Sequence, residues 1–256
     1  MLHVTPICAF TDNYIWVIHD QYYAVVVDPG DALPVLNFLL QQNLKLIAIL
    51  NTHHHKDHTG GNAVLLGKYS VPIYGPAGEF IPTLTHRLRE GDRIYLEELS
   101  LSFSVLDIPG HTAGHIAYFG ENFLFCGDTL FACGCGRLFE GTAEQMYSSL
   151  QKLAELPDAT LVYCGHEYTL DNIYFAREVE PNNQILNDLE TSVMKLREQK
   201  NSSLPSTIER EKLSNPFLRC NQSEVIHSAS HYLNKELSDP VSVFSAIRHW
   251  KNNFLR

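Results

Sequence analysis

The feature that most constrains the fold of this chain is a set of short apolar runs that end in loops carrying His or Asp. Four such runs are "AILN" before His53, "LDIPG" before His111, "FLFCG" before Asp128 and "LVYCG" before His166. Their length and apolar content predict strands that are buried on at least one face. Because α/β proteins usually place their sites on the loops that leave the strands, we expect these side chains to converge.

Helical patterns alternate with the predicted strands and then replace them. "DALPVLNFLLQQN" begins at Asp31, and "TAEQMYSSLQKLAELP" begins at Thr142 with Glu144 in its first turn. Beyond Tyr168 the strand signal fades, and "LDNIYFAREVEP", "NQILNDLETSVMKLREQK" and "VSVFSAIRHWKNNF" show helical periodicity. The sequence therefore predicts a mixed α/β fold followed by a helical C-terminal region that begins near residue 167.

The composition is that of an ordinary soluble globular protein, with 45% hydrophobic and 19% charged residues among 256. The net charge of −10 disfavours a nucleic-acid partner, since phosphate contacts need clustered Lys and Arg. No apolar run reaches the length of a membrane span, and the first residues do not resemble a secretory signal. We therefore expect a cytoplasmic protein without a membrane partner.

Charge and cysteines are unevenly placed along the chain. Residues 1–190 carry 9 basic and 23 acidic residues, whereas residues 191–256 carry 10 basic and 6 acidic ones. The tail is therefore the basic part of an acidic chain, and this asymmetry needs an explanation. The six cysteines form no regular framework, so we expect reduced thiols; the pair Cys133 and Cys135 is only a weak signal for a redox or soft-metal site.

The stretch "LNTHHHKDHTGG" concentrates donors that bind metal ions. Taken singly, each His or Asp could be a helix cap or a solvated loop residue, but all of them together at strand ends predict a metal site. Imidazole and carboxylate ligands without thiolate suit zinc, iron or manganese in a catalytic site. Five or more candidate ligands exceed the need of one tetrahedral ion, so two ions are expected, with Asp128 as the bridging carboxylate.

The motifs that carry these donors resemble a known superfamily. "THHHKDH", "PGHTAGH", "FCGDTLF" and "CGHEYT" are similar, in this order, to the ligand motifs of the metallo-β-lactamase superfamily. Within it, "GCGRLFEGT", "GHEYT", "NPFLR" and "RHWK" resemble the hydroxyacylglutathione hydrolase, or glyoxalase II, family. The resemblance spans nearly the whole chain.

This resemblance implies a metallo-β-lactamase-like αββα sandwich of two mixed sheets. Residues 1–166 would form the catalytic domain and residues 167–256 a helical substrate-binding domain. One ion would be held by His53, His55 and His111, and the other by Asp57, His58 and His166, with Asp128 between them. His54 falls at a variable position of the motif, and for His115 a packing or supporting role is expected.

The implied activity is hydrolysis of S-(2-hydroxyacyl)glutathione thioesters, chiefly S-D-lactoylglutathione, to D-lactate and glutathione in methylglyoxal detoxification. Two divalent ions, with zinc preferred over iron and manganese, would acidify a bridging water to hydroxide. Asp57 would orient this water. The tetrahedral oxyanion would be stabilised by the ions. The thiolate leaves readily, so no strong general acid is needed.

Four residues are expected to contact the glutathione part of the substrate. Family motifs indicate Arg137 and Tyr168, and the basic tail offers Arg248 and Lys251, three residues apart on one helix. Better-known eukaryotic members of the family have a Tyr where this chain has Phe139. The missing hydroxyl predicts an altered affinity for the same class of substrate.

Two other readings of the sequence remain open. The chain could be another hydrolase of the same fold, such as a general thioesterase or a lactonase, although "RHWK" in the helical tail disfavours this. It could also be a metal-binding module without turnover. We expect a monomer.

Overall fold

The computed structural model describes residues 1–254, and its sheets and helices divide into two compact units. Unit 1 consists of residues 1–107, 113–127 and 163–166. Unit 2 consists of residues 108–112 and 128–162 and continues from residue 167 to the end of the described chain. The last two residues of the predicted substrate-binding region, 255–256, lie outside the described residues.

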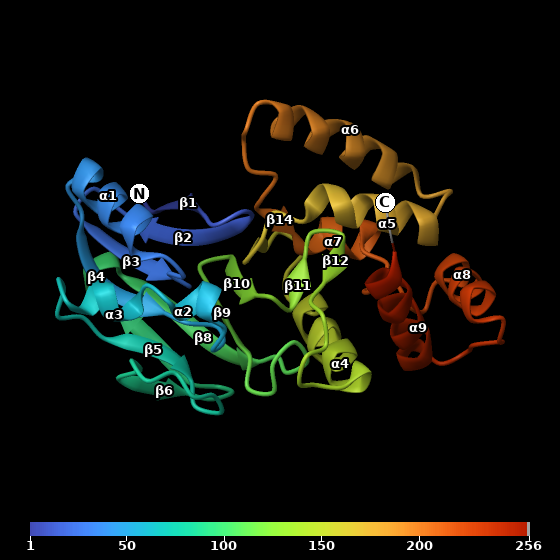
Figure 1. Cartoon of the computed structure of the whole chain (residues 1–256), viewed down its shortest axis with the longest axis horizontal. Coiled ribbons are helices and arrows are strands. Elements are labelled where there is room, and N and C mark those ends of the chain that lie inside the picture. Colours follow the sequence, from blue (N-terminus) through green and yellow to red (C-terminus); the bar gives the residue numbers. More distant parts are fainter. Residues whose placement is uncertain (255–256) are drawn as a thin grey trace. The chain divides into compact units, whose positions relative to one another are not determined.

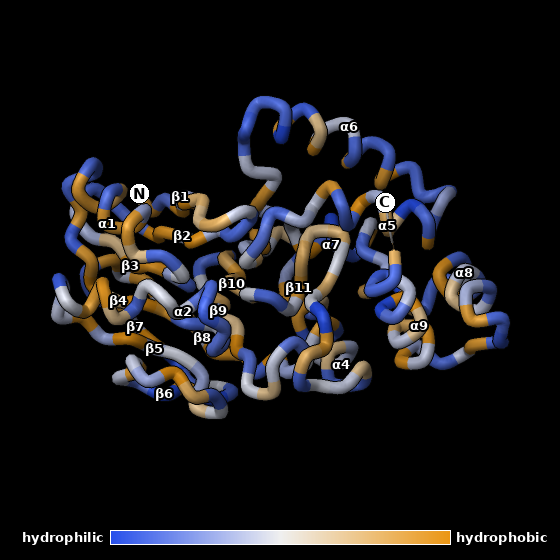
Figure 2. Tube along the Cα trace, in the orientation of Figure 1, coloured by the Kyte–Doolittle hydropathy of each residue, from blue (hydrophilic) through white to orange (hydrophobic). Residues whose placement is uncertain are grey.

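Unit 1 contains a six-stranded sheet with the order β1-β2-β3-β4-β5-β6 (Figure 1). Its strands are β1 (His3–Ala9), β2 (Asn13–His19), β3 (Tyr23–Val27), β4 (Lys45–Leu50), β5 (Ile73–Pro76) and β6 (His86–Leu88). The pairs from β1 to β3 are antiparallel and those from β3 to β6 are parallel, so the sheet is mixed. The central strands β2, β3 and β4 are almost fully buried and stand out as apolar in Figure 2.

Helix α1 (Ala32–Gln42) connects β3 to β4 and covers one face of this sheet. Asp31 caps it by accepting a hydrogen bond from the Leu33 backbone, as "DALPVL" predicts. Its buried side chains Val35 and Leu39 join a core cluster with strand residues such as Val26. The short helices α2 (Lys56–Thr59) and α3 (Asn62–Leu66) follow β4.

The second sheet has the order β14-β13-β10-β9-β8-β7. Its strands are β7 (Arg93–Leu96), β8 (Leu101–Asp107), β9 (Ile116–Gly120), β10 (Phe123–Gly127), β13 (Leu161–Cys164) and β14 (Ser206–Thr207), with the 3-10 helix η1 (Glu97–Leu99) between β7 and β8. In unit 1 it meets the first sheet, since the Tyr118 hydroxyl donates to the Asn51 carbonyl at 2.8 Å. The Trp16 indole likewise donates to the Cys164 carbonyl at 2.9 Å.

Unit 2 is built mainly from helices. They are α4 (Ala143–Ala154), α5 (Thr169–Val179), α6 (Gln184–Glu198), α7 (Ile208–Ser214), α8 (Ser223–Leu233) and α9 (Pro240–Asn253). A two-stranded hairpin of β11 (Leu130–Phe131) and β12 (Gly134–Cys135) precedes α4. The rings of Phe175, Phe217 and Phe244 are fully buried and pack against one another in series.

The predicted fold class is confirmed: two sheets with helices, followed by a helical C-terminal region. Every predicted strand run is a strand, and the helix predicted from Thr142 begins with a capping box between Thr142 and Gln145. Among the described residues, no helix is both long enough and apolar enough to span a membrane.

Candidate metal centre

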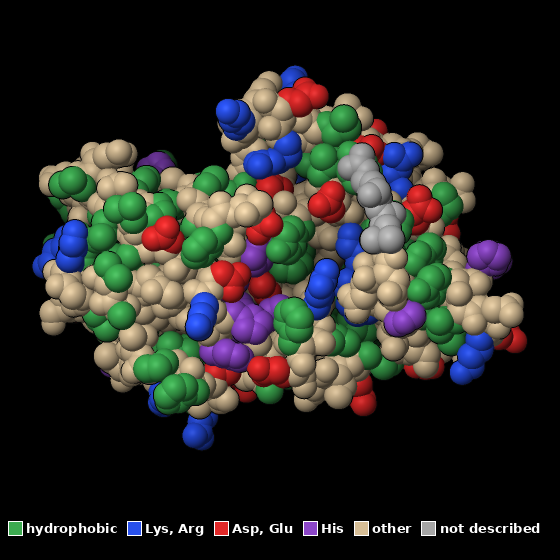
Figure 3. All heavy atoms as spheres, in the orientation of Figure 1, with side chains coloured by type: hydrophobic (Ala, Val, Ile, Leu, Met, Phe, Trp, Pro, Cys, Tyr) green, Lys and Arg blue, Asp and Glu red, His purple; other side chains and the backbone are tan. Residues whose placement is uncertain are grey.

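The segment that follows β4 carries the densest group of predicted ligands. β4 is buried at every residue after Lys45, and the chain then passes through Thr52, His53 and His55 directly into α2. α2 supplies Asp57 and His58 within its first turn. His166 also belongs to unit 1, although it comes from a distant part of the sequence, two residues after the end of β13. Figure 3 shows a group of histidine side chains at the surface, with acidic side chains beside it.

Asp57, His58 and His166 form a three-ligand group within unit 1. The Asp57 Oδ2 atom lies 3.6 Å from His58 Nε2 and 3.5 Å from His166 Nε2. An ion that is about 2.1 Å from each atom, at tetrahedral angles, would separate such ligand atoms by roughly 3.4 Å. All three donor atoms lie within 4.8 Å of one another, so the group fits a zinc-sized cation.

Carboxylates orient both imidazoles of this group. His58 Nδ1 lies 3.1 Å from Asp28 Oδ2, and His166 Nδ1 lies 2.8 Å from Asp12 Oδ1. A carboxylate accepts a hydrogen bond from Nδ1–H, which leaves the lone pair on Nε2, the atom that faces the group. Asn13 completes the arrangement, because its amide donates to Asp57 Oδ2 at 3.0 Å.

His53 and His55 form a second group of donors in unit 1. His53 Nε2 and His55 Nδ1 are 3.1 Å apart, a spacing at which two ring nitrogens either share a proton or bind one cation. The Thr52 hydroxyl donates to Asp28 Oδ2 at 2.6 Å, and it can therefore accept from His53 Nδ1 at 3.0 Å. His53 Nε2 consequently carries the lone pair and is a suitable ligand atom.

Asp28 lies close enough to His53 and His58 to be counted among the possible ligands. Its two oxygens, however, accept from the Thr52 backbone at 2.8 Å, from the Thr52 hydroxyl and from His58 Nδ1. The side chain is buried, with an exposed fraction of 4%. Asp28 therefore holds Thr52 and His58 in place by hydrogen bonds, and we do not count it as a metal ligand.

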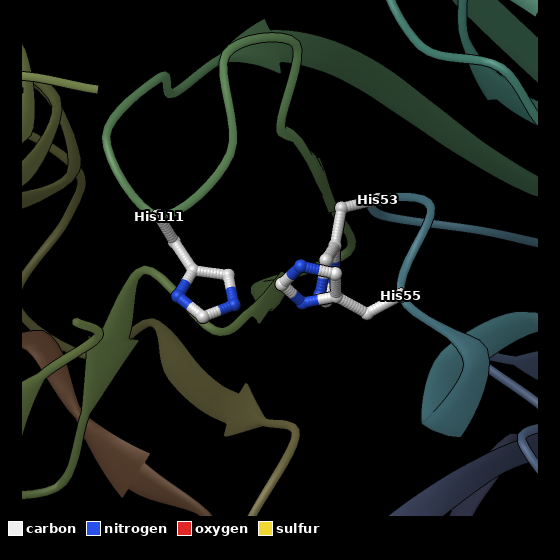
Figure 4. Close-up of side chains that lie close together, drawn as sticks. All are labelled: His53, His55 and His111. Carbon is white, nitrogen blue, oxygen red and sulfur yellow. The ribbon is translucent and has the colours of Figure 1, made fainter. Parts of the chain in front are cut away.

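Unit 2 holds the remaining two predicted ligands, His111 and Asp128. His111 Nε2 lies 3.5 Å from Asp128 Oδ2, again the spacing of two ligands on one ion. His111 Nδ1 donates to the Arg137 carbonyl at 2.9 Å, which leaves the lone pair on Nε2. Figure 4 shows His53 and His55 with their rings beside each other, and His111 on the loop that follows β8.

The neighbouring histidines have other partners. His54 Nδ1 lies 2.9 Å from the Glu79 carboxylate, and one third of its side chain is exposed. His115 is fully buried; its ring stacks on that of His53 with centroids 4.5 Å apart, and its Nδ1 donates to the Ile116 carbonyl. These contacts agree with leaving His54 out of the ligand set and with a packing role for His115.

The predicted substrate contacts all lie in unit 2. Arg248 is buried; it donates to the Cys135 carbonyl at 2.7 Å and stacks over the Phe217 ring. The Lys251 ammonium donates to the Asp171 carbonyl at 2.9 Å and lies over the Phe175 ring. Burial, together with the nearby Arg248 charge, lowers the pKa of Lys251 to about 8.

The other two predicted contacts lie at the ends of local elements. Tyr168 stands at the N-terminal end of α5 with its ring against Phe131. Arg137 stands two residues after β12, and its carbonyl accepts a hydrogen bond from His111. The two cysteines of this region, Cys133 and Cys135, are buried thiols that form no disulfide. Burial raises the pKa of both.

The supporting residues Asp12, Asn13 and Asp28 were not predicted from the sequence. Asp28 carried a usable signal, since it ends the apolar run "YAVVVDPG" in the same way that Asp128 ends "FLFCGD". Asp12 lies in the turn between β1 and β2, and Asn13 is the first residue of β2, positions where polar residues are expected in any case.

The Asp28 contacts generate a prediction. In Asp28→Asn an amide group replaces one of the oxygens that accept from Thr52 and His58, so both metal-binding segments lose an anchor. Asp28 has a positive φ of 53°, which Asn tolerates, so backbone strain is not added. We expect the zinc affinity, measured by competition with a chelator, to fall about 10- to 100-fold.

Asp31→Asn is the matched control, because Asp31 caps α1 and Asn is an equally good cap. Its zinc affinity should equal that of the parent. Equal zinc affinity in Asp28→Asn and the parent would contradict the supporting role.

Comparison with known proteins identifies the two parts of the chain. A family model described as "Metallo-beta-lactamase superfamily" matches residues 10–166, and one described as "Hydroxyacylglutathione hydrolase C-terminus" matches residues 167–254. The hydroxyacylglutathione hydrolase of Nitrosomonas europaea is 62% identical over 254 residues, which cover 99% of this chain and 97% of that protein.

Solved structures agree with this relationship at the level of the fold. ETHE1 from Myxococcus xanthus has a TM-score of 0.67 and 26% identity, with 98% of each chain covered. A structure of TTHA1623 in a di-iron-bound form has a TM-score of 0.59 and 25% identity, and it covers 84% of this chain and all of that one. The chain therefore belongs to the hydroxyacylglutathione hydrolase family of the metallo-β-lactamase superfamily.

Proposed function

We propose that the chain hydrolyses S-(2-hydroxyacyl)glutathione thioesters, chiefly S-D-lactoylglutathione, to D-lactate and glutathione, the second step of methylglyoxal detoxification. The observation that carries the proposal is the group of Asp57, His58 and His166, whose atoms stand at the spacing of three ligands on one ion. Its occurrence in a chain 62% identical to a hydroxyacylglutathione hydrolase supports the substrate class.

The ligand set that we propose holds two ions. His53, His55 and His111, the three imidazoles drawn in Figure 4, would bind the first ion, and Asp57, His58 and His166 the second, with Asp128 bridging both. Zinc suits these nitrogen and oxygen ligands, and iron or manganese would also be accepted. A relative with two irons has been solved, which supports the count of two.

Divalent ions at this site would lower the pKa of water toward neutrality and polarise the acyl carbonyl. Asp57 is the residue of this chain best placed to orient the attacking water. Its side chain is 41% exposed while its Oδ2 atom is fixed by the Asn13 amide, so the carboxylate is both accessible and held in one orientation. The thiolate leaving group needs little protonation, since the pKa of a thiol is about 8.5.

Recognition of glutathione is proposed for residues of unit 2. The two carboxylates of glutathione need cations. Arg137 would supply one, and Arg248 and Lys251 would supply two more from residues 191–256, the part of the chain that carries the net positive charge. Tyr168 would add a hydroxyl. We therefore propose residues 1–166 as the catalytic domain and residues 167–256 as the substrate-binding domain.

A single chain carries every proposed ligand and substrate contact, which supports a monomeric enzyme. The cysteines are all free thiols, as expected in a reducing compartment, and this supports a cytoplasmic location. Nucleic acid and membrane are not proposed as partners.

The activity itself is the first test of this proposal. Protein loaded with two equivalents of zinc should release thiol from S-D-lactoylglutathione, and chelation should abolish the release. Asp57→Asn should lower kcat by about 100-fold or more, because the water loses its orienting carboxylate. His54→Ala, which changes a neighbouring histidine outside the ligand set, should keep the parent activity.

The competing functions give different outcomes in the same assay. A general thioesterase would cleave S-lactoyl-N-acetylcysteamine as readily as the glutathione thioester, and a lactonase would favour a lactone over both. Fully metallated protein that is inactive on all three compounds would instead be a metal-binding module, and the proposal would be wrong.

A second prediction concerns Phe139, which lies in the loop after β12. Phe139 is exposed and packs its ring edge-on against His111, and its position offers no hydroxyl to the substrate. Phe139→Tyr adds a hydrogen-bonding group that is worth about 0.5–1 kcal/mol, so KM for S-D-lactoylglutathione should fall roughly two- to fivefold with kcat unchanged. Phe38→Tyr makes the same chemical change on α1 and should leave KM unaltered; an unchanged KM in Phe139→Tyr removes the basis of this expectation.

The lowered pKa of Lys251 predicts a pH dependence of substrate capture. The ammonium is charged below about pH 8 and loses its charge as the pH rises through that value. After subtraction of spontaneous hydrolysis, kcat/KM, which reports groups of the free enzyme, should therefore fall about fivefold between about pH 7 and pH 9.5.

Lys251→Arg is the matched variant, because a guanidinium stays charged over this range. Its kcat/KM should lack the alkaline fall. A fall of the same size and midpoint in the parent and in Lys251→Arg would show that another group causes it.

A further inference from the structure

The β11–β12 hairpin is a short segment of unit 2 that lies between two functional positions of the chain. Asp128, the proposed bridging ligand, stands two residues before it, and Arg137, a proposed substrate contact, stands two residues after it. Its turn contains Cys133 with a φ of +54°, an unusual conformation for a residue other than glycine. Such a turn persists only where its surroundings hold it.

Side chains from the helical region hold the backbone of this hairpin at each residue from Phe131 to Cys135. The Asn215 amide donates to the Phe131 carbonyl at 3.1 Å and to the Gly134 carbonyl at 2.9 Å. The Asn172 amide donates to the Ala132 carbonyl at 3.1 Å, and the Cys133 backbone donates to Glu211 Oε2 at 2.8 Å. Arg248 closes the series at the Cys135 carbonyl.

Three of these side chains, Asn172, Glu211 and Asn215, are called the hairpin clamp below. Glu211 and Asn215 are fully buried, and Asn172 is 5% exposed. Burial raises the pKa of Glu211, and hydrogen bonds from Ser206 and Asn215 partly offset this effect. A buried carboxylate is costly, so its partners, one of which is the strained Cys133 turn, need to be in place.

The ends of the hairpin are joined directly to the proposed metal ligands. The Gly136 backbone donates to the Thr129 carbonyl at 3.1 Å, and a Cβ atom on Gly136 would lie 1.9 Å from the Asp128 carbonyl oxygen. The next residue, Arg137, accepts the hydrogen bond from His111 Nδ1. A displacement of the hairpin would therefore move Asp128, the His111 ring and Arg137 together.

We propose that Asn172, Glu211 and Asn215 are positioning residues of the reaction, which hold the β11–β12 hairpin so that Asp128, His111 and Arg137 keep their working arrangement. The inference rests on the proposed function, since it concerns the same site. It gives the helical region a second task besides binding substrate: the clamp sets the geometry of two metal ligands that lie outside the helices.

Glu211→Ala tests the clamp, with Glu180→Ala as the matched control. Glu180 is also a buried carboxylate of unit 2 whose pKa burial raises, but it pairs with Arg219 and does not touch the hairpin. Both variants lose a buried acceptor and should lower the melting temperature. Only Glu211→Ala should weaken zinc binding, by about tenfold in chelator competition, and alter the visible spectrum of the cobalt-substituted protein.

The kinetic expectation separates the two ends of the hairpin. In Glu211→Ala kcat should fall about tenfold through Asp128 and His111, and KM should rise through Arg137. Glu211→Gln is the conservative variant; its amide oxygen can still accept from Cys133 while its nitrogen donates to Ser206, so zinc affinity and the cobalt spectrum should return to near the parent values. If Glu211→Ala does not fold, Asn172→Ala removes one clamp bond and should lower zinc affinity about threefold.

Parent-like zinc affinity and cobalt spectrum in Glu211→Ala, or in Asn172→Ala where Glu211→Ala does not fold, would overturn the proposal, and so would an equal change in Glu180→Ala. The metal measurements need no substrate. If the parent hydrolyses no glutathione thioester, the proposed function fails, while zinc affinity and the cobalt spectrum still decide whether the clamp positions the ligands.

Discussion

The buried carboxylate of Asp28 is the interaction on which the metal-binding part of unit 1 depends. It stands at the end of β3 and binds the start of the ligand segment after β4 through the Thr52 backbone and hydroxyl, and α2 through His58. Because it accepts three hydrogen bonds at once, it determines which nitrogen of His58, and through Thr52 which nitrogen of His53, carries the lone pair. The ligands are thus prepared by the protein before any ion is bound.

Much of the fold could be predicted because the core strands are short apolar runs bounded by Gly, Pro or Asn, as in "YAVVVDPG" and "KLIAILNTH". Strand β1 was not predicted from the sequence, and the reason is physical. It is the edge strand of its sheet, contains Pro6 and is only partly buried, so its sequence lacks the sustained apolar run of β3 or β4. Short elements such as β14 and α7 are likewise stabilised by tertiary contacts, through the pairing of β14 with β13 and the bond of Glu211 to the Cys133 backbone, more than by local sequence preference.

The proposed ligands could be found from the sequence, whereas the residues that orient them could not. A ligand motif is local, and the spacing of His53, His55, Asp57 and His58 is visible in one stretch. Glu211 shows the opposite case, since "IEREKLS" has the composition of a solvated helix, yet this glutamate is fully buried against Cys133, 78 residues away in the sequence. Whether a charged residue faces water or a partner is decided by packing between distant segments, which no local pattern records.

The charges of Arg248 and Lys251 support the proposal that the helical region binds an anionic ligand. Arg248 and Lys251 are three residues apart, and their hydrogen bonds and ring contacts go to carbonyl oxygens and aromatic rings, which carry no full charge. The Asp171 carboxylate raises the pKa of Lys251 but does not offset the effect of burial. The mutual repulsion of Arg248 and Lys251 adds to the effect of burial in lowering the pKa of Lys251. A ligand with two carboxylates would offset both the burial of the two positive charges and their mutual repulsion, and a neutral acyl compound would offset neither. In the proposed function, the same charges would favour a glutathione thioester over an uncharged thioester before any shape complementarity is considered.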